Sequence, residues 1–196
     1  MSKRAFDLAA SLCGLLLLAP LLGAIALWIR LDSPGPVFYR QLRIGRNGVP
    51  FHIFKFRTMT AQPAGGAQLT VGKDARITRA GRFLRHYKLD ELAQLINVVQ
   101  GSMSLVGPRP EVPRYVACYP PDVARIVLSV APGITDWASI HYKDENAILG
   151  HAVDPEQAYI ETILPVKLDY YVRYVEQRSF WTDLRIILRT LTAIAR

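Results

Sequence analysis

The chain has 196 residues, a formal net charge of +8 and 51% hydrophobic residues, which suits one domain with a buried core plus an appendage. Residues 1–88 contain 14 Lys and Arg against three acidic residues, whereas residues 89–196 contain 10 against 13. The basic half is expected to face an anionic partner, such as lipid headgroups or a phosphorylated substrate. Nucleic acid is not expected, because no recognisable nucleic-acid-binding motif accompanies the charge.

The N-terminal segment is the first predicted element. Residues 8–29 contain no charged side chain, which is enough for a transmembrane helix. Basic residues flank both ends, so the positive-inside rule gives no orientation. Pro20 removes a backbone donor in mid-segment, and freed carbonyls in hydrocarbon need other partners. Two alternatives remain open: a spanning helix, or a helix-break-helix that enters and leaves on the cytoplasmic face.

A β-hairpin is predicted next. Residues 37–44 and 49–57 have strand character and are joined at Asn47-Gly48, a strong hairpin turn signal. Alternation along the second strand puts Lys55 and Arg57 on one face. Two neighbouring cations either form a solvated strand face or belong to a functional site, and the sequence leaves both interpretations open. Residues 62–68 are rich in Gly, Pro and Gln and indicate a surface loop.

The rest of the chain is predicted to be mainly helical, with residues 78–87 forming a short basic helix. Apolar periodicity predicts a helix over about 90–100, ended by Gly101 as a C-cap. Residues 104–106 are expected to be extended, 121–130 helical, 131–135 a turn and 155–174 mostly helical. Residues 179–194 are expected to form a helix with Ser179 as its N-cap. Its split apolar and basic face makes it either interfacial or packed on the core. The fold class is therefore α+β, mainly helical.

Asp90 and Glu91 are the central candidates for chemistry. Acidic residues in a first helical turn are often simple caps. A capping box would place Glu or Gln at position 93, but that residue is Ala93. A helix N-terminus also favours phosphate, and Arg85 lies about one turn upstream. Arg109 stands between two prolines, so its backbone is restrained for bidentate phosphate contacts. Carboxylates beside a diphosphate also invite Mg²⁺, and Asp can attack phosphorus.

These residues fall in motifs that cover nearly the whole chain and resemble the bacterial sugar transferase family, the monotopic phosphoglycosyl transferases. The matching motifs are SPGPVFY (33–39), KFRTM (55–59), GRFLR (81–85), LDEL (89–92), LINV (95–98), GSMSLVGPRP (101–110), PGIT (132–135) and RSFWTDL (178–184). The resemblance implies transfer of a phosphosugar from a UDP-sugar to polyprenyl (undecaprenyl) phosphate, with release of UMP. It places this step at the start of bacterial glycoconjugate synthesis.

The resemblance also implies roles for individual residues. Asp90 is expected to form a covalent phosphosugar intermediate in a ping-pong reaction, and Glu91 to assist it. Both are expected to contact Mg²⁺. The residues expected to bind or support phosphate are Lys55, Arg57, Arg85, Lys88 and Arg109. Lys88 and Ala93 differ from the usual family residues, Ser or Thr and Pro respectively.

Finally, the resemblance implies a membrane arrangement. Residues 1–31 are expected to be re-entrant with a break at Pro20, although Ala19 replaces the usual Ser before it. Residues 32–196 would form the catalytic domain, and 179–195 an interfacial helix. The chain looks like the small form of the family, at the cytoplasmic face of the bacterial inner membrane among anionic lipids. A homo-oligomer is left open. The alternative of another class is a non-catalytic, basic, membrane-bound scaffold.

Overall fold

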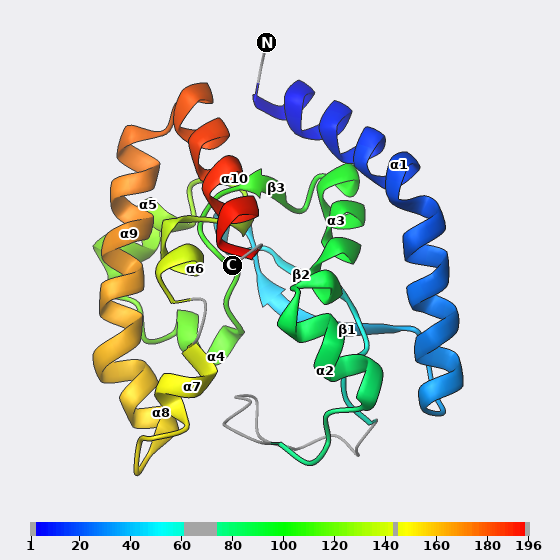
Figure 1. Ribbon diagram of the computed structural model, residues 1–196. Coiled ribbons are helices and arrows are strands. Elements are labelled where there is room, and N and C mark those ends of the chain that lie inside the picture. Colours follow the sequence, from blue (N-terminus) through cyan, green and yellow to red (C-terminus); the bar gives the residue numbers. More distant parts are fainter. Residues whose placement is uncertain (1–2, 61–73, 143–144, 195–196) are drawn as a thin grey trace.

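The computed structural model describes residues 3–60, 74–142 and 145–194, and it has the predicted mainly helical α+β architecture (Figure 1). The long N-terminal helix α1 (Lys3–Asp32) lies along one side, and helix α9 (Leu164–Gln177) lies along the other. Between them are a β-hairpin, two short strands and the last helix, α10 (Phe180–Ile194). The surface loop predicted at 62–68 lies outside the described residues.

Helix α1 (Lys3–Asp32) is helical on both sides of Pro20 and at Pro20 itself, so the break expected there is not confirmed. It is long and apolar enough to cross a membrane by length and composition, and only 11% of its most apolar window is buried. The core helix of a soluble protein is mostly buried, and α1 is mostly exposed, so α1 does not have the burial of a core helix. Its outward surface is lined by large exposed side chains: Leu12, Leu16, Leu17, Leu21, Leu27, Trp28 and Leu31.

The N-terminal end of α1 is bound to the domain by polar contacts. Lys3 forms an ion pair with Asp183 of α10, and Arg4 donates to backbone carbonyls at the end of α3 (Gln94–Gln100). The buried carboxylate of Asp7 accepts a hydrogen bond of 2.7 Å from the Ser104 hydroxyl. A carboxylate is acceptable in this buried position because it is hydrogen-bonded.

The C-terminal end of α1 is bound to the same domain. Asp32 Oδ2 accepts a 3.0 Å hydrogen bond from the Ala80 backbone N–H at the start of α2. Ile25 and Ile29 are buried in a cluster with Phe56 and Leu84. Helix α1 therefore lies lengthwise against the domain, with both of its ends held there.

The predicted hairpin is confirmed. Strands β1 (Phe38–Ile44) and β2 (Pro50–Phe56) pair in antiparallel register. They are joined by the 3₁₀ turn η1 (Arg46–Gly48), in which Asn47 and Gly48 have φ of 58° and 76°. Asn and Gly tolerate this left-handed backbone, which explains why this dipeptide predicts the turn correctly.

The segment carrying Asp90 differs from the predicted single α-helix. Helix α2 (Arg79–His86) ends before Lys88, which has a left-handed φ of 54°. The 3₁₀ turn η2 (Leu89–Ala93) follows, and α3 begins only later (Gln94–Gln100). Because the left-handed Lys88 changes the direction of the backbone, the residues that follow it form a short 3₁₀ turn and not the first turn of an α-helix. Gly101, with φ of 88°, ends α3 as predicted.

The region predicted as a turn at 131–135 contains a strand. Strand β4 (Gly133–Thr135) pairs in parallel with β3 (Ser104–Val106). A Cβ on Gly133 would lie 2.1 Å from the backbone nitrogen of Gly107. Only glycine permits this close approach, which brings together segments that are distant in the sequence.

The C-terminal part forms a helical layer around its own core. Its short helices are α4 (Pro113–Val116), α5 (Pro121–Val127), α6 (Trp137–His141), α7 (Glu145–Leu149) and α8 (Pro155–Ala158). The prediction that residues 155–174 are mostly helical is confirmed: a π-helical segment, η3 (Tyr159–Ile163), joins α8 to α9 (Leu164–Gln177). Pro165 lies at the start of α9, where its missing N–H is tolerated. Tyr159, Leu164 and Tyr171 are fully buried in the core.

Helix α10 (Phe180–Ile194) begins after Ser179, whose hydroxyl accepts from the Thr182 N–H at 3.1 Å, as a predicted N-cap does. Ile186 is buried against β3 and Tyr174. The side chains of Trp181, Leu188 and Leu191 are 73%, 56% and 60% exposed. One face of α10 therefore packs on the core, and the other presents apolar side chains to the surroundings.

Candidate active site

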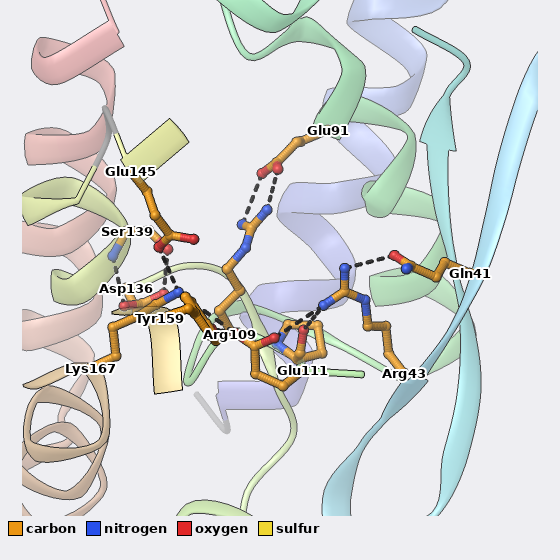
Figure 2. A network of polar contacts seen from close by, with 11 residues as sticks. Gln41, Arg43, Glu91, Arg109, Glu111, Asp136, Ser139, Glu145, Tyr159 and Lys167 are labelled. Atoms are coloured by element: carbon orange, nitrogen blue, oxygen red, sulfur yellow. Dashed lines mark hydrogen bonds and ion pairs between the residues drawn. The ribbon is translucent and has the colours of Figure 1, made fainter. Parts of the chain in front are cut away.

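Glu91 joins two cations at the centre of the molecule. Its carboxylate accepts a 2.9 Å contact from Lys55 Nζ of β2 and is held by both terminal nitrogens of Arg109. Figure 2 shows the two parallel contacts between Arg109 and Glu91. A two-pronged guanidinium contact of this kind fixes orientation as well as position. The structure therefore brings together three of the predicted site residues.

Asp90 has a different environment from its neighbour. It is 8% exposed, and in the described part of the chain its carboxylate accepts no hydrogen bond and forms no ion pair. It does not stand at the N-cap position of η2 either, because that position is Lys88. A buried acidic group without a partner is unfavourable for folding. The cap interpretation is therefore not supported at this position.

The pKa values of the two acids move in opposite directions. Burial raises the pKa of Asp90 above its ordinary value, and the charge of Lys55 only partly opposes this. Burial would also raise the pKa of Glu91, but Arg109 and Lys55 outweigh it and hold the pKa of Glu91 well below its usual range. Opposed environments for adjacent titratable groups are typical of sites where the two acids have different roles.

The backbone around Arg109 is held on both sides. The carbonyl of Pro108 accepts from the Gly133 N–H at 2.9 Å, and that of Pro110 accepts from Arg43 Nη1 at 2.9 Å. The two prolines restrict φ on either side of the arginine. This rigid loop explains why the guanidinium reaches Glu91 in one orientation.

Arg85 and Lys88 both contribute positive charge at Asp90. Arg85 donates to Thr58 Oγ1 at 2.8 Å. Burial lowers the pKa of Arg85, and the charge of Asp90 opposes this. Lys88 also contributes to the field at Asp90, where its charge favours the ionised carboxylate. The structure thus places both cations within electrostatic reach of the acid.

Arg57 lies elsewhere. Its guanidinium is buried and donates to the backbone carbonyls of Ile29, Ser33 and Pro34, at 3.2 Å and 2.7 Å for the first two. These carbonyls are at the end of α1, where a helix leaves acceptors unsatisfied. The structure therefore does not bring Arg57 to Asp90 and Glu91; it places Arg57 at the junction between α1 and the domain.

Further polar residues near Arg109 were missed by sequence reasoning. Glu111, Asp136 and Lys167 are all nearly fully buried, and they belong to the network in Figure 2. Burial raises the pKa of Asp136, whose carboxylate accepts from the Ser139 N–H and hydroxyl at 3.0 Å and 2.6 Å. Glu111 directly follows the Pro-Arg-Pro run, which is the one local signal that could have indicated it. Lys167 had no local signal, because only the tertiary fold brings α9 here.

A magnesium ion would need a substrate to complete its ligands. Among the described residues, no group of three or more His, Cys, Asp or Glu side chains could hold a metal ion. Magnesium sites often combine one or two carboxylates with substrate phosphates. The unengaged carboxylate of Asp90 fits such a role, whereas Glu91 already contacts two cations. The residues therefore fit an ion shared with a bound diphosphate.

Comparison with known proteins shows the family. The bacterial sugar transferase family matches residues 1–196, so the chain belongs to this family. It is 42% identical over 200 residues to an undecaprenyl-phosphate glucose phosphotransferase of Komagataeibacter xylinus, covering 97% of this chain and 35% of that protein.

Two other relatives have related names. An Aeromonas hydrophila UDP-N-acetylgalactosamine-undecaprenyl-phosphate N-acetylgalactosaminephosphotransferase is 35% identical, over 98% of this chain and 43% of that protein. A Caulobacter vibrioides UDP-glucose:undecaprenyl-phosphate glucose-1-phosphate transferase is 38% identical, over 99% of this chain and 70% of that protein. The chain thus spans less than half the length of the first two relatives.

Proposed function

We propose that this protein is a phosphoglycosyl transferase that moves a phosphosugar from a UDP-sugar to undecaprenyl phosphate. The observation that carries the proposal is the contrast between an unengaged, buried Asp90 and a Glu91 held by Lys55 and Arg109. The names of the relatives support the donor and acceptor classes. The first test is release of UMP from a panel of UDP-sugars in the presence of undecaprenyl phosphate. A scaffold would release none.

The reaction proceeds in two steps. A carboxylate oxygen of Asp90 attacks the β-phosphorus of the donor, the bond from that phosphorus to the bridging oxygen breaks, and UMP leaves. A phosphate oxygen of the acceptor then attacks the same phosphorus, which forms the polyprenyl diphosphate sugar and restores the Asp90 carboxylate. Splitting the transfer in this way is a known use of an enzymic carboxylate.

The cations around Asp90 stabilise the charge that develops in both steps. Arg109 and Lys55 are positioned by Glu91 before substrate arrives, so they need little reorganisation. Arg85 and Lys88 add positive charge near Asp90 and favour its ionised form. The Asp90 carboxylate would hold Mg²⁺, which would supply positive charge against the donor phosphates. Activity is therefore expected to require a divalent cation, and full turnover in a chelator would contradict this part of the proposal.

We also infer that the protein is monotopic, at the cytoplasmic face of the inner membrane. The supporting observation is that both ends of α1 contact one domain, at Asp7 and Asp32, while its other face is apolar and exposed. The test uses Ser2→Cys and Arg30→Cys variants made without Cys13 and Cys118. An impermeant maleimide should label both variants only in inverted vesicles. Labelling of one of them in intact spheroplasts would indicate a spanning helix.

A further inference from the structure

Arg109 lies between two carboxylates that could compete for it. Glu91 holds its terminal nitrogens, and Glu111 is only two residues away in the chain. Glu111 is 6% exposed, so its charge is poorly solvated and attracts any cation that can reach it. Figure 2 shows Arg109 directed to Glu91 rather than to Glu111. Something must therefore neutralise Glu111.

Three groups meet the Glu111 carboxylate. The Tyr159 hydroxyl donates to Oε1 at 2.6 Å, Arg43 Nη1 lies 3.4 Å from Oε2, and Lys167 Nζ lies 3.6 Å from Oε1. Arg43 is shared, because the same Nη1 donates to the Pro110 carbonyl at 2.9 Å. Lys167 therefore provides a second positive charge at Glu111, beside that of Arg43.

The ammonium group of Lys167 is held in a fixed position by its neighbours. It lies on α9, its side chain is 4% exposed, and its ammonium group also contacts Glu145 Oε2 at 2.9 Å and the Tyr159 hydroxyl at 3.2 Å. The ring of Tyr159 lies 5.0 Å from the ammonium nitrogen. A lysine held by this many fixed partners is a rigid charge, not a solvated surface group.

The pKa of Glu111 reflects both of its cationic neighbours. Burial would raise the pKa of Glu111, but Lys167 and Arg43 hold it below its ordinary value. Arg109 also contributes to the field at Glu111. If the Lys167 charge were removed, Arg43 would be the one cation among the described residues left in contact with Glu111, and Arg109 is the other cation that contributes to the field there.

We propose that Lys167 is a positioning residue that neutralises Glu111 and thereby keeps the Arg109 guanidinium on Glu91, facing the phosphates of the donor. The inference about the donor rests on the proposed function. The inference about the orientation of Arg109 does not, because it concerns the ligand-free protein. The two can therefore be tested separately.

The first experiment measures UMP release by the full chain in detergent or nanodiscs. Lys167→Met and Lys167→Gln should each raise the KM for the UDP-sugar and lower kcat/KM at least tenfold, because both lack the charge. Lys167→Arg should retain most of the activity. Adding Glu111→Gln to either neutral variant should restore kcat/KM to within about threefold of Glu111→Gln alone, since no carboxylate then competes for Arg109.

The control is Arg173→Met on the same helix. Arg173 forms an exposed pair with Asp169, with side chains 65% and 55% exposed, and its loss should leave kcat/KM within about threefold of wild type. If Lys167→Met fails to fold, Lys167→Gln carries the test, because it keeps a hydrogen-bond donor for Glu145 and Tyr159. Wild-type kcat/KM in Lys167→Gln would overturn the proposal, and so would a loss that Glu111→Gln does not relieve.

The second experiment needs no turnover. Arginine side-chain ¹⁵N–¹H spectra of the ligand-free protein report the partner of Arg109, whose signals are assigned by their loss in Arg109→Lys. These signals should shift in Lys167→Gln and return in the double variant with Glu111→Gln. Unshifted signals in Lys167→Gln would contradict the inference whatever the enzyme does. Absence of UMP release by the wild type would instead contradict the proposed function.

Discussion

At the scale of single residues, the main finding is that two adjacent acids experience opposite surroundings. Glu91 is neutralised by Lys55 and Arg109, whereas Asp90 is buried with no described hydrogen-bond partner. A group that lowers stability and is nonetheless present in a site is typical of a reacting residue. The same contrast predicts different consequences for removing each charge.

Asp90→Asn should abolish UMP release without lowering the thermal midpoint. Since burial raises the pKa of Asp90, its ionised form is less stable in the folded protein than in the unfolded chain. Removing that charge should leave the midpoint unchanged or raise it by about 2–4 °C, which corresponds to roughly 1 kcal/mol. Calorimetry or fluorescence melting in the same detergent checks this. A large drop in the midpoint would mean that Asp90 has a structural role.

Glu91→Gln should have the opposite effect on stability. Lys55 and Arg109 would lose the carboxylate between them, and unpairing of partly buried charges is costly, on the order of 3 kcal/mol. The thermal midpoint should fall, and turnover should fall at least a hundredfold. The matched comparison is Asp90→Asn, which changes the neighbouring carboxyl in the same way. Equal midpoints for the two variants would contradict the contrast described here.

Glu111 should contribute to the pH dependence of stability. Its folded pKa lies below its ordinary value of 4.5, so the folded protein favours the ionised form. This contribution is fully present above about pH 4.5 and is lost as the pH falls through the folded pKa. Midpoints measured from neutral pH downward should therefore decrease less steeply in Glu111→Gln than in wild type. Parallel curves would show that Glu111 contributes nothing to acid sensitivity.

At the scale of elements, the junction after α1 explains how this long apolar helix is fixed to the rest of the domain. Arg57 donates to the carbonyls of Ile29, Ser33 and Pro34, and Gly35 follows with φ of 121°. A Cβ on Gly35 would lie 2.2 Å from Arg57 Nη1. The glycine therefore serves both the backbone conformation and the approach of the arginine.

Gly35→Ala should destabilise this junction. The new methyl group displaces Arg57 and also strains a left-handed backbone, with an expected loss on the order of 1–3 kcal/mol. Hydrogen exchange of the last turn of α1 and the thermal midpoint are the measurements. Gly48→Ala is the control, because no atom lies within 4 Å of its added Cβ although its φ is also positive. Equal losses in both variants would assign the effect to backbone strain alone.

The elements also show where sequence reasoning succeeds. The hairpin was predictable because Asn47-Gly48 encodes its turn locally, and Gly101 and Ser179 mark helix ends by local chemistry. The 3₁₀ turn after Lys88 was not predictable, because a lysine gives no local signal for a left-handed backbone. Strand β4 (Gly133–Thr135) was hidden because its partner is distant in the sequence and only three residues long.

At the scale of the whole molecule, charge and apolar surface are arranged together. The basic first half of the sequence includes α1 and the hairpin, and the exposed apolar faces of α1 and α10 both carry large side chains. Anionic headgroups attract such a protein over distances set by the ionic strength, while apolar burial does not depend on salt in this way.

Binding to vesicles should therefore have two components. Affinity for anionic vesicles should fall as salt is raised and then level off, and affinity for zwitterionic vesicles should depend little on salt. Co-sedimentation of the purified full chain measures both. A salt-independent affinity for anionic vesicles would contradict an electrostatic contribution from the basic half.

Most residues of the candidate site could be predicted, but one predicted residue lies elsewhere and one buried lysine near the site was not predicted. Asp90, Glu91 and Arg109 were indicated by their local motifs, and Lys55 by its strand face. Arg57 was predicted on the same strand face as Lys55, but its guanidinium donates to backbone carbonyls at the end of α1 and does not reach the site. Lys167 could not be predicted, because its role depends on how α9 packs behind the Arg109 loop.

The most direct test of the account is covalent capture at Asp90. Purified protein is incubated with Mg²⁺ and each UDP-sugar but no acceptor, and both UMP and the intact mass are measured. The account predicts one equivalent of UMP and a mass increase of one phosphosugar, which maps to Asp90, is absent in Asp90→Asn and is discharged by undecaprenyl phosphate. Turnover with acceptor but no UMP and no added mass without it would contradict a covalent aspartyl intermediate.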